Sequence, residues 1–201
     1  MEETVKIKWY FRLLSKLDDE RTNVNMVNRV AAYVLDWIAA SFVTAFPTVT
    51  MYMAITKTQD INQNLFSFPS YYGYIAGALS ILFCMIYYVV LPLRKNSKGQ
   101  TPGKRFMEVK IVKKDGSDVD LKTMLKRQVV GLLIVEGCFV AAGTYLCQIL
   151  SMISGYNLTF VLGAVSALLC LASTFLALRT GSRRMLHDYI AGTKVISVHE
   201  E

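Results

Sequence analysis

Charged residues are scarce in this sequence. Asp, Glu, Lys and Arg make up only 18% of its 201 residues, while hydrophobic residues make up 53%. A soluble domain usually carries about 25% charged and about 45–50% apolar residues. The length suits one domain, and the composition favours one that keeps much of its surface in lipid. The net charge of +7 could suit nucleic acid, but with this hydropathy we expect a membrane as the partner and no nucleic acid.

Cysteine and histidine are also scarce. None of the four cysteines stands in a CxxC pair, which excludes a disulfide-rich scaffold, and with His187 and His199 they show no zinc-ligand spacing. No histidine lies in the apolar stretches, which argues against an intramembrane serine protease. We therefore expect neither a metal nor a cofactor, and no enzymatic activity.

Four apolar segments are long enough to cross a bilayer, which takes roughly 20 helical residues. They span 30–55, 71–93, 129–153 and 158–178, and Asp36 and Glu136 are the only charged residues within them. The predicted fold class is an all-α membrane protein with four transmembrane helices.

The cations predict the orientation. Of the 22 Lys and Arg residues, all but Lys57 fall before the first span, between the second and third, or after the fourth. The positive-inside rule assigns these segments to the cytoplasm. We therefore expect a multi-pass protein of a bacterial cytoplasmic membrane with both termini cytoplasmic.

Two regions lie outside the spans. Residues 1–25 carry a helical stripe of Val5, Trp9, Leu13 and Leu17, which predicts a short amphipathic helix. This helix could lie on the membrane surface or pack over the ends of the bundle. The remainder, 26–198, forms the membrane domain, with a cytoplasmic loop at 94–128.

The cytoplasmic loop contains a small β-like element. Residues 106–112 alternate in part between apolar and polar, Lys114-Asp-Gly116 is typical of a hairpin turn, and 195–198 form another β-like run. The stretch Gly99-Gln-Thr-Pro-Gly-Lys104 lacks the spacing and the Ser or Thr of a phosphate-binding loop. We expect it to form a tight turn, with Lys104 and Arg105 facing lipid phosphates of an anionic surface.

Asp36 and Glu136 are the candidate functional residues inside the membrane. An acidic residue near a span centre costs about 2.5–3.5 kcal/mol, whereas each large aliphatic residue or Phe returns only about 0.3–0.6 kcal/mol. Asp36 therefore needs protein, water or a cation beside it. Arg29 lies on the same helix face about two turns, or about 10 Å, away. It is the expected partner, although at this distance a water, an ion or a third residue could fill the gap. The acids could form a proton or cation site, or a structural clamp that orients the helices.

The sequence resembles the bacterial RDD family, which is named for one arginine and two aspartates. Arg29 and Asp36 match the first two, and Asp188 in Leu186-His-Asp-Tyr-Ile-Ala-Gly-Thr193 matches the third. The resemblance covers about residues 26–198 and includes the Gly99–Lys104 stretch and Arg127 before the third span. Glu136 is not part of the pattern.

The resemblance implies a multi-pass membrane protein, and sodium–proton antiport has been suggested for some members. It also adds His187 and Asp188, which we expect to fold back beside Arg29 and form an Arg29–Asp36–Asp188 network. We expect Arg127, like Lys104 and Arg105, to contact lipid phosphates or the loop. The leading hypothesis is secondary transport of a small cation or solute, coupled to protonation of Asp36, by a homo-oligomer. The alternative is a non-enzymatic accessory or regulatory subunit that binds another membrane protein.

Overall fold

The computed structural model describes residues 22, 24–135, 137 and 140–198. The helical stripe predicted within the amphipathic segment 1–25 lies outside the described residues, and so does Glu136. The described chain is mostly helical, with a single antiparallel pair of strands in this part.

Three helical segments are long and apolar enough to cross a membrane. The first is α2 (Met26–Thr56), which begins at an Asn25 cap and at 31 residues is about 46 Å long. The second combines α3 (Tyr72–Met85), the π-helical turn η2 (Ile86–Val90) and α4 (Leu91–Leu93). The third is α8 (Thr159–Arg179). They agree closely with three of the four predicted spans.

The third predicted span, 129–153, is not one continuous helix. The chain forms the π-helix η3 (Lys126–Val135), and α7 (Ala141–Ser154) starts only after extended backbone at Val140. With 14 residues, α7 is shorter than a membrane-spanning helix. A Cβ on Gly143 would lie 2.1 Å from the carbonyl oxygen of Gly137. The backbone at Gly143 therefore packs directly against the backbone at Gly137 at this interruption.

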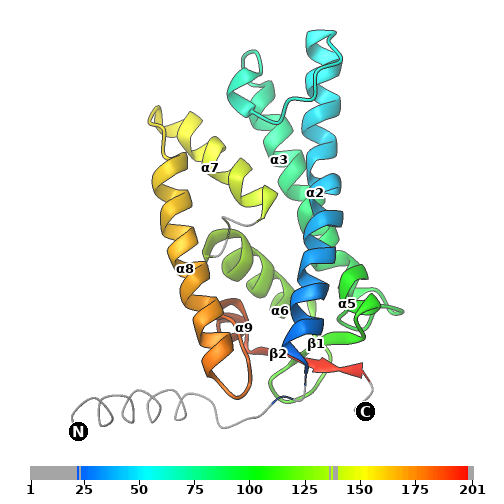
Figure 1. The fold of residues 1–201 in the computed structure, drawn as a ribbon. Helices are drawn as coiled ribbons and strands as arrows, with labels where there is room; N and C mark the ends of the chain where they lie inside the picture. Colours follow the sequence, from blue (N-terminus) through cyan, green and yellow to red (C-terminus); the bar gives the residue numbers. More distant parts are fainter. Residues whose placement is uncertain (1–21, 23, 136, 138–139, 199–201) are drawn as a thin grey trace, which may run out of the picture.

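The helices form a bundle, in which α3 packs between α2 and α7, and α7 packs against α8 (Figure 1). The short 3-10 helix η1 (Leu65–Ser67) covers α3 and α7 at one end. At this end, buried Leu65 packs with Phe68, Ala76 and Tyr145.

The opposite end, called the polar end below, carries the short elements. These are α5 (Pro102–Phe106), β1 (Val109–Lys113), α6 (Leu121–Leu125), α9 (Leu186–Ala191) and β2 (Thr193–Ser197). β1 pairs antiparallel with β2, with Ile111 opposite Val195. The predicted β-like element is therefore confirmed, and the predicted turn at Lys114–Gly116 leads back to a single bridge between Val112 and Asp118.

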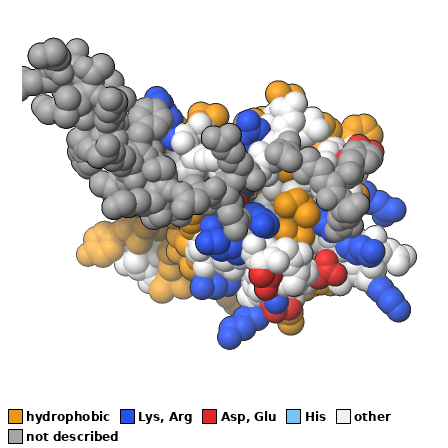
Figure 2. All heavy atoms as spheres, turned by 90° about the horizontal axis from the view of Figure 1, so that it is seen from below, with side chains coloured by type: hydrophobic (Ala, Val, Ile, Leu, Met, Phe, Trp, Pro, Cys, Tyr) orange, Lys and Arg blue, Asp and Glu red, His pale blue; other side chains and the backbone are white. Residues whose placement is uncertain are grey.

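The surface divides by chemistry. Large apolar side chains such as Phe42, Phe160 and Leu168 are exposed along the helices, as expected for contact with lipid. Lys and Arg side chains gather on the face of the polar end (Figure 2). Exposed cations of the described chain include Arg94, Lys95, Lys98, Arg105, Lys114, Lys122, Lys126 and Arg179.

Candidate functional site

Asp36 is buried at the level where α5 meets α2. Its Oδ1 accepts hydrogen bonds from Tyr87 Oη at 2.9 Å and from the Gly103 backbone N–H at 2.8 Å. Its Oδ2 accepts a hydrogen bond from the Thr101 hydroxyl and forms an ion pair with Lys104 Nζ at 3.0 Å. Both carboxylate oxygens are therefore satisfied, with one cation as partner.

The Gly99–Lys104 stretch is built to approach α2 closely. Thr101 stands at the N-cap position of α5, but its hydroxyl donates to Asp36 rather than capping the helix. Pro102 follows in the first turn, where the fixed φ of proline suits a helix start. A Cβ at position 103 would lie 2.6 Å from the Ala32 carbonyl oxygen and 2.8 Å from Asp36 Oδ1. Only glycine lets the backbone N–H reach the carboxylate here.

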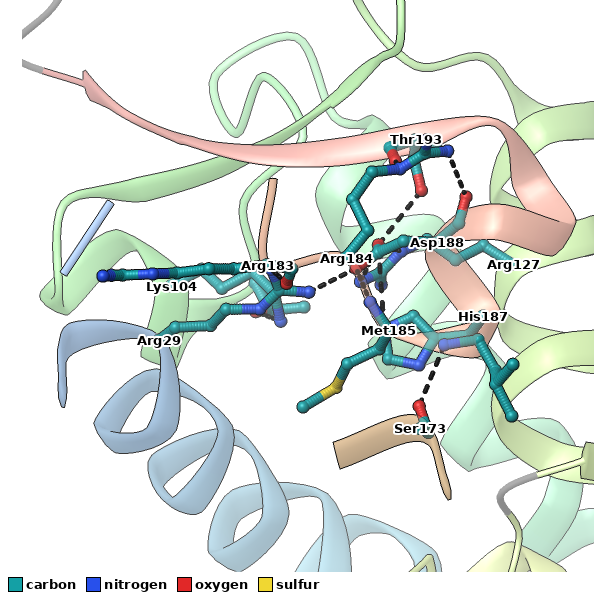
Figure 3. Close-up of polar contacts among 12 residues, drawn as sticks. Arg29, Lys104, Arg127, Ser173, Arg183, Arg184, Met185, His187, Asp188 and Thr193 are labelled. Atoms are coloured by element: carbon teal, nitrogen blue, oxygen red, sulfur yellow. Dashed lines mark hydrogen bonds and ion pairs between the residues drawn. The ribbon is translucent and has the colours of Figure 1, made fainter. Parts of the chain in front are cut away.

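Asp188 forms a second buried cluster at the polar end (Figure 3). Its Oδ2 pairs with Arg29 Nη2 and accepts the Met185 backbone N–H at 3.2 Å. Its Oδ1 accepts Arg127 Nε and Nη2 at 3.1 and 3.0 Å and the Thr193 hydroxyl at 3.1 Å. The carboxylate thus joins α2, η3, α9 and the start of β2.

Backbone carbonyls hold the surrounding arginines in place. Arg29 also donates to the Arg183 carbonyl, and Arg184 donates to the carbonyls of Thr193 and Asp188 at 2.8 and 3.1 Å. His187 Nε2 lies 3.7 Å from Asp188 Oδ1. A short loop and α9 are therefore clamped onto the end of α2.

The two clusters differ in electrostatics. Burial alone would raise the pKa of Asp188, but the charges of Arg127 and Arg29 hold it well below its usual range. Burial lowers the pKa of Lys104, and the attraction of Asp36 offsets this only in part. The Asp188 cluster therefore stays ionised at neutral pH, whereas Lys104 gives up its proton more readily than an exposed lysine.

The predicted Arg29–Asp36–Asp188 network divides into two clusters in the structure. Arg29 pairs with Asp188 as expected, but no hydrogen bond or ion pair among the described residues joins Arg29 to Asp36. Two helical turns separate them along α2, so Arg29 meets α9 while Asp36 meets α5.

Two cations also differ from the expectation. Lys104 does not face lipid phosphates, because its side chain is only 13% exposed and contacts Asp36. Arg127 is not a loop contact but a buried partner of Asp188. Arg105 is exposed, and its predicted contact with lipid phosphates stays a prediction.

The two clusters border one cavity of about 280 Å³. Arg29, Asp36, Lys104, Arg127 and His187 contribute to its wall, which is otherwise mainly apolar. Among the described residues, no group of three His, Cys, Asp or Glu side chains could hold a metal ion.

Several residues of the site were missed in the sequence. Tyr87 lies in an apolar run and looks like a membrane-interface tyrosine, and Gln128 looks like an ordinary polar residue before a span. Thr101 had a usable signal, because a Thr before Pro-Gly is typical of a helix start.

Apolar helices of membrane-crossing length, with two buried charge clusters at one end, define a multi-helix membrane protein. The family model of the RDD family matches residues 24–192, a range that contains Arg29, Asp36 and Asp188, and the chain belongs to this family.

One curated relative is "Uncharacterized protein YckC" of Bacillus subtilis (strain 168). It is 30% identical over 167 residues, which cover 83% of this chain and 80% of that protein. No solved structure matches the chain.

Proposed function

We propose that the protein is a secondary transporter that exchanges a small cation for a proton, without an enzymatic step. The supporting observation is a column of buried polar side chains along α2 and its neighbours. Asp36, Thr44 and Thr48 lie on the buried face of α2, eight and four residues apart, with Ala40 between the first two. Polar side chains inside a membrane bundle are costly and commonly mark ion or proton pathways.

The column continues beyond α2. The hydroxyls of Thr48 and Ser80 lie 2.5 Å apart, and Tyr145 Oη donates to Gln63 Oε1 at 3.2 Å near the end that carries η1. Thr44 is fully buried and its hydroxyl has no partner among the described residues. Hydroxyls both donate and accept, so with intervening water such a column can pass protons or partly hydrate a small cation.

The Asp36–Lys104 pair would couple the two movements. A cation that binds the Asp36 carboxylate takes the place of Lys104 Nζ. The displaced ammonium, whose pKa is already lowered by burial, then releases one proton to water. One positive charge enters as another leaves, so the exchange is electroneutral. The Asp188 cluster would stay fixed and hold α9 against α2, and the pathway would be completed in a homo-oligomer.

The test is proton movement in proteoliposomes that contain a trapped pH-sensitive dye. A sodium, lithium or potassium gradient should drive a pH change, and Asp36→Asn should reduce its initial rate at least about tenfold, as loss of a charged partner worth over 1.4 kcal/mol implies. Arg105→Gln is the matched control, because it removes an exposed cation one residue from Lys104 and should keep the wild-type rate. Absent flux in folded wild-type protein, or an unchanged rate in Asp36→Asn, would contradict the proposal.

A non-enzymatic accessory subunit is the second candidate, favoured by the full satisfaction of both aspartates. Every carboxylate oxygen of Asp36 and Asp188 already has partners. Such clusters can act as clamps that present the basic face of the polar end to another membrane protein. Stoichiometric co-purification with one membrane protein, together with no flux in proteoliposomes, would favour this role.

A further inference from the structure

The cavity beside the two charge clusters lies between α2 and α8. Val30 and Tyr33 of α2 and Cys170 and Thr174 of α8 contribute to its apolar part, while Arg29 and Arg127 mark its polar part. Val30 and Tyr33 are also 47% and 37% exposed, so this part of the wall reaches the outer surface of the bundle. The cavity therefore has a charged inner part and an apolar side that reaches the outer surface of the bundle.

Gln128 is the feature of this wall that lacks an explanation within the protein. It lines the cavity and is 1% exposed, and neither Nε2 nor Oε1 has a hydrogen-bond partner in the described chain. Buried amides nearly always have partners. An amide with both atoms unpaired on a cavity wall points to a ligand that offers an acceptor and a donor together.

The charged side chains around the cavity indicate that this ligand is negatively charged. Arg29, Lys104 and Arg127 all contribute to the cavity wall. In the described chain the Asp188 carboxylate pairs with Arg29 and Arg127, and Asp36 pairs with Lys104, so three cations face two carboxylates. Buried charges of one sign in excess favour a counter-charge close by.

We infer that this cavity binds one anionic glycerophospholipid from the leaflet beside the polar end. A phosphate oxygen accepts from Gln128 Nε2 near Arg29 and Arg127, and a headgroup hydroxyl donates to Gln128 Oε1. The hydrocarbon chain leaves between α2 and α8. Ligand cavities typically measure about 300–1,000 Å³, so about 280 Å³ holds the headgroup and the adjoining part of a chain. The cavity shares Asp36 and Lys104 with the proposed transport pathway, but the binding of lipid does not depend on transport.

The first experiment uses the wild-type chain in bilayers with phosphatidylglycerol that carries a photoreactive group in its acyl chain. Illumination should label peptides from α2 around Tyr33 and from α8 around Thr174. Phosphatidylcholine with the same group should label them at least about tenfold less. Equal labelling by both lipids, or labelling confined to other helices, would overturn the inference.

The second experiment compares Gln128→Met with wild type in a thermal unfolding assay in detergent. Without lipid, Gln128→Met should unfold at the same or a higher temperature, because it removes an unpartnered buried amide. With phosphatidylglycerol, wild type should be stabilised, and the variant should need about tenfold more lipid for the same shift, since it loses hydrogen bonds to a charged headgroup. A purely structural role for Gln128 predicts the opposite result without lipid.

Controls separate the possible sources of the anion. Lys114→Gln, which removes an exposed cation outside the cavity, should respond to phosphatidylglycerol like wild type. Inorganic phosphate and glycerol phosphate alone should not reproduce the stabilisation, because they lack the chain; if they do, the site takes a free phosphate and the lipid assignment fails. An identical lipid response of Gln128→Met and wild type would also refute the lipid assignment. If Gln128→Met does not fold, the labelling experiment on the wild-type chain decides.

Discussion

At the scale of single residues, the protein separates two aspartates that look alike in the sequence. Asp36 has one lysine and three neutral donors, whereas Asp188 has two arginines. A buried ion pair stabilises the fold only while both partners are present, since removal of one leaves the other charge buried and uncompensated.

Arg127→Ala should therefore destabilise the protein strongly. Arg127 is 5% exposed and makes two hydrogen bonds to a carboxylate that is fully buried, so the free energy of unfolding should fall by about 3–5 kcal/mol. Arg105→Ala should change it by less than about 0.5 kcal/mol, as for most surface positions. Unfolding in detergent, followed by temperature or denaturant, measures both, and equal losses would contradict a structural role for the Asp188 cluster.

The lowered pKa of Asp188 predicts a dependence on acid. A carboxyl group whose folded pKa lies below its unfolded value of about 3.9 stabilises fully above that pH, and this contribution is lost as pH falls toward the folded pKa. Wild type should keep the Asp188 contribution from pH 8 to 5 and lose it below about pH 4. Asp188→Asn should be less stable at neutral pH, and its difference from wild type should shrink in acid. A difference that stays constant from pH 7 to 3 would argue against this origin.

At the scale of elements, the interruption between η3 and α7 is the main departure from simple hydropathy. Hydropathy alone favours one span of 25 residues at 129–153. The chain instead passes itself at Gly137 and Gly143, and α7 then packs against α3 and α8.

Gly143→Ala should disturb this interruption. The added Cβ would meet the Gly137 carbonyl oxygen at 2.1 Å, and backbone atoms cannot move aside as a flexible side chain can. We expect a loss of about 1–3 kcal/mol in the free energy of unfolding, as for overpacked cores. Gly163→Ala is the control, because nothing lies within 4 Å of its added Cβ, and it should raise helix stability by about 0.5–1 kcal/mol. Equal stability of both variants would show that Gly143 is not confined as described.

At the scale of the whole molecule, the distribution of cations remains the basis for orientation. Exposed cations of the described chain gather at the polar end, whereas Lys57 lies just after α2 at the other end. The positive-inside rule predicts that the polar end is cytoplasmic.

Labelling of single cysteines from outside the cell tests this orientation. In a chain whose native cysteines are replaced by alanine, Lys57→Cys should react with a membrane-impermeant reagent, while Lys114→Cys should react only after the membrane is opened. Both side chains are exposed, so the comparison does not depend on burial. The reverse pattern would overturn the predicted topology.

Some features followed from the sequence because they depend on neighbouring residues. Three apolar spans and the grouping of cations follow from local composition, and the β-like run that became β1 follows from local alternation. Asp36 was marked as a buried charge that needs a partner, whereas Asp188 entered through the family resemblance. The pairing of Arg29 with Asp188 came from a family resemblance rather than from spacing. Tyr87 and Gln128 gave no signal, because neither residue type nor position distinguished them from ordinary interface residues.

The sequence by itself determined that this is a membrane protein with an aspartate inside its first apolar span, since hydropathy and charge are properties of composition and order. Only the tertiary structure decided which cation each aspartate meets. Lys104 is 68 residues from Asp36, and Arg29 is 159 residues from Asp188, so these pairs depend on how α5 and α9 pack against α2. The interruption of the third apolar segment and the cavity beside Gln128 have the same origin, because close packing between distant segments, rather than hydropathy, decides where backbone and side chains have room.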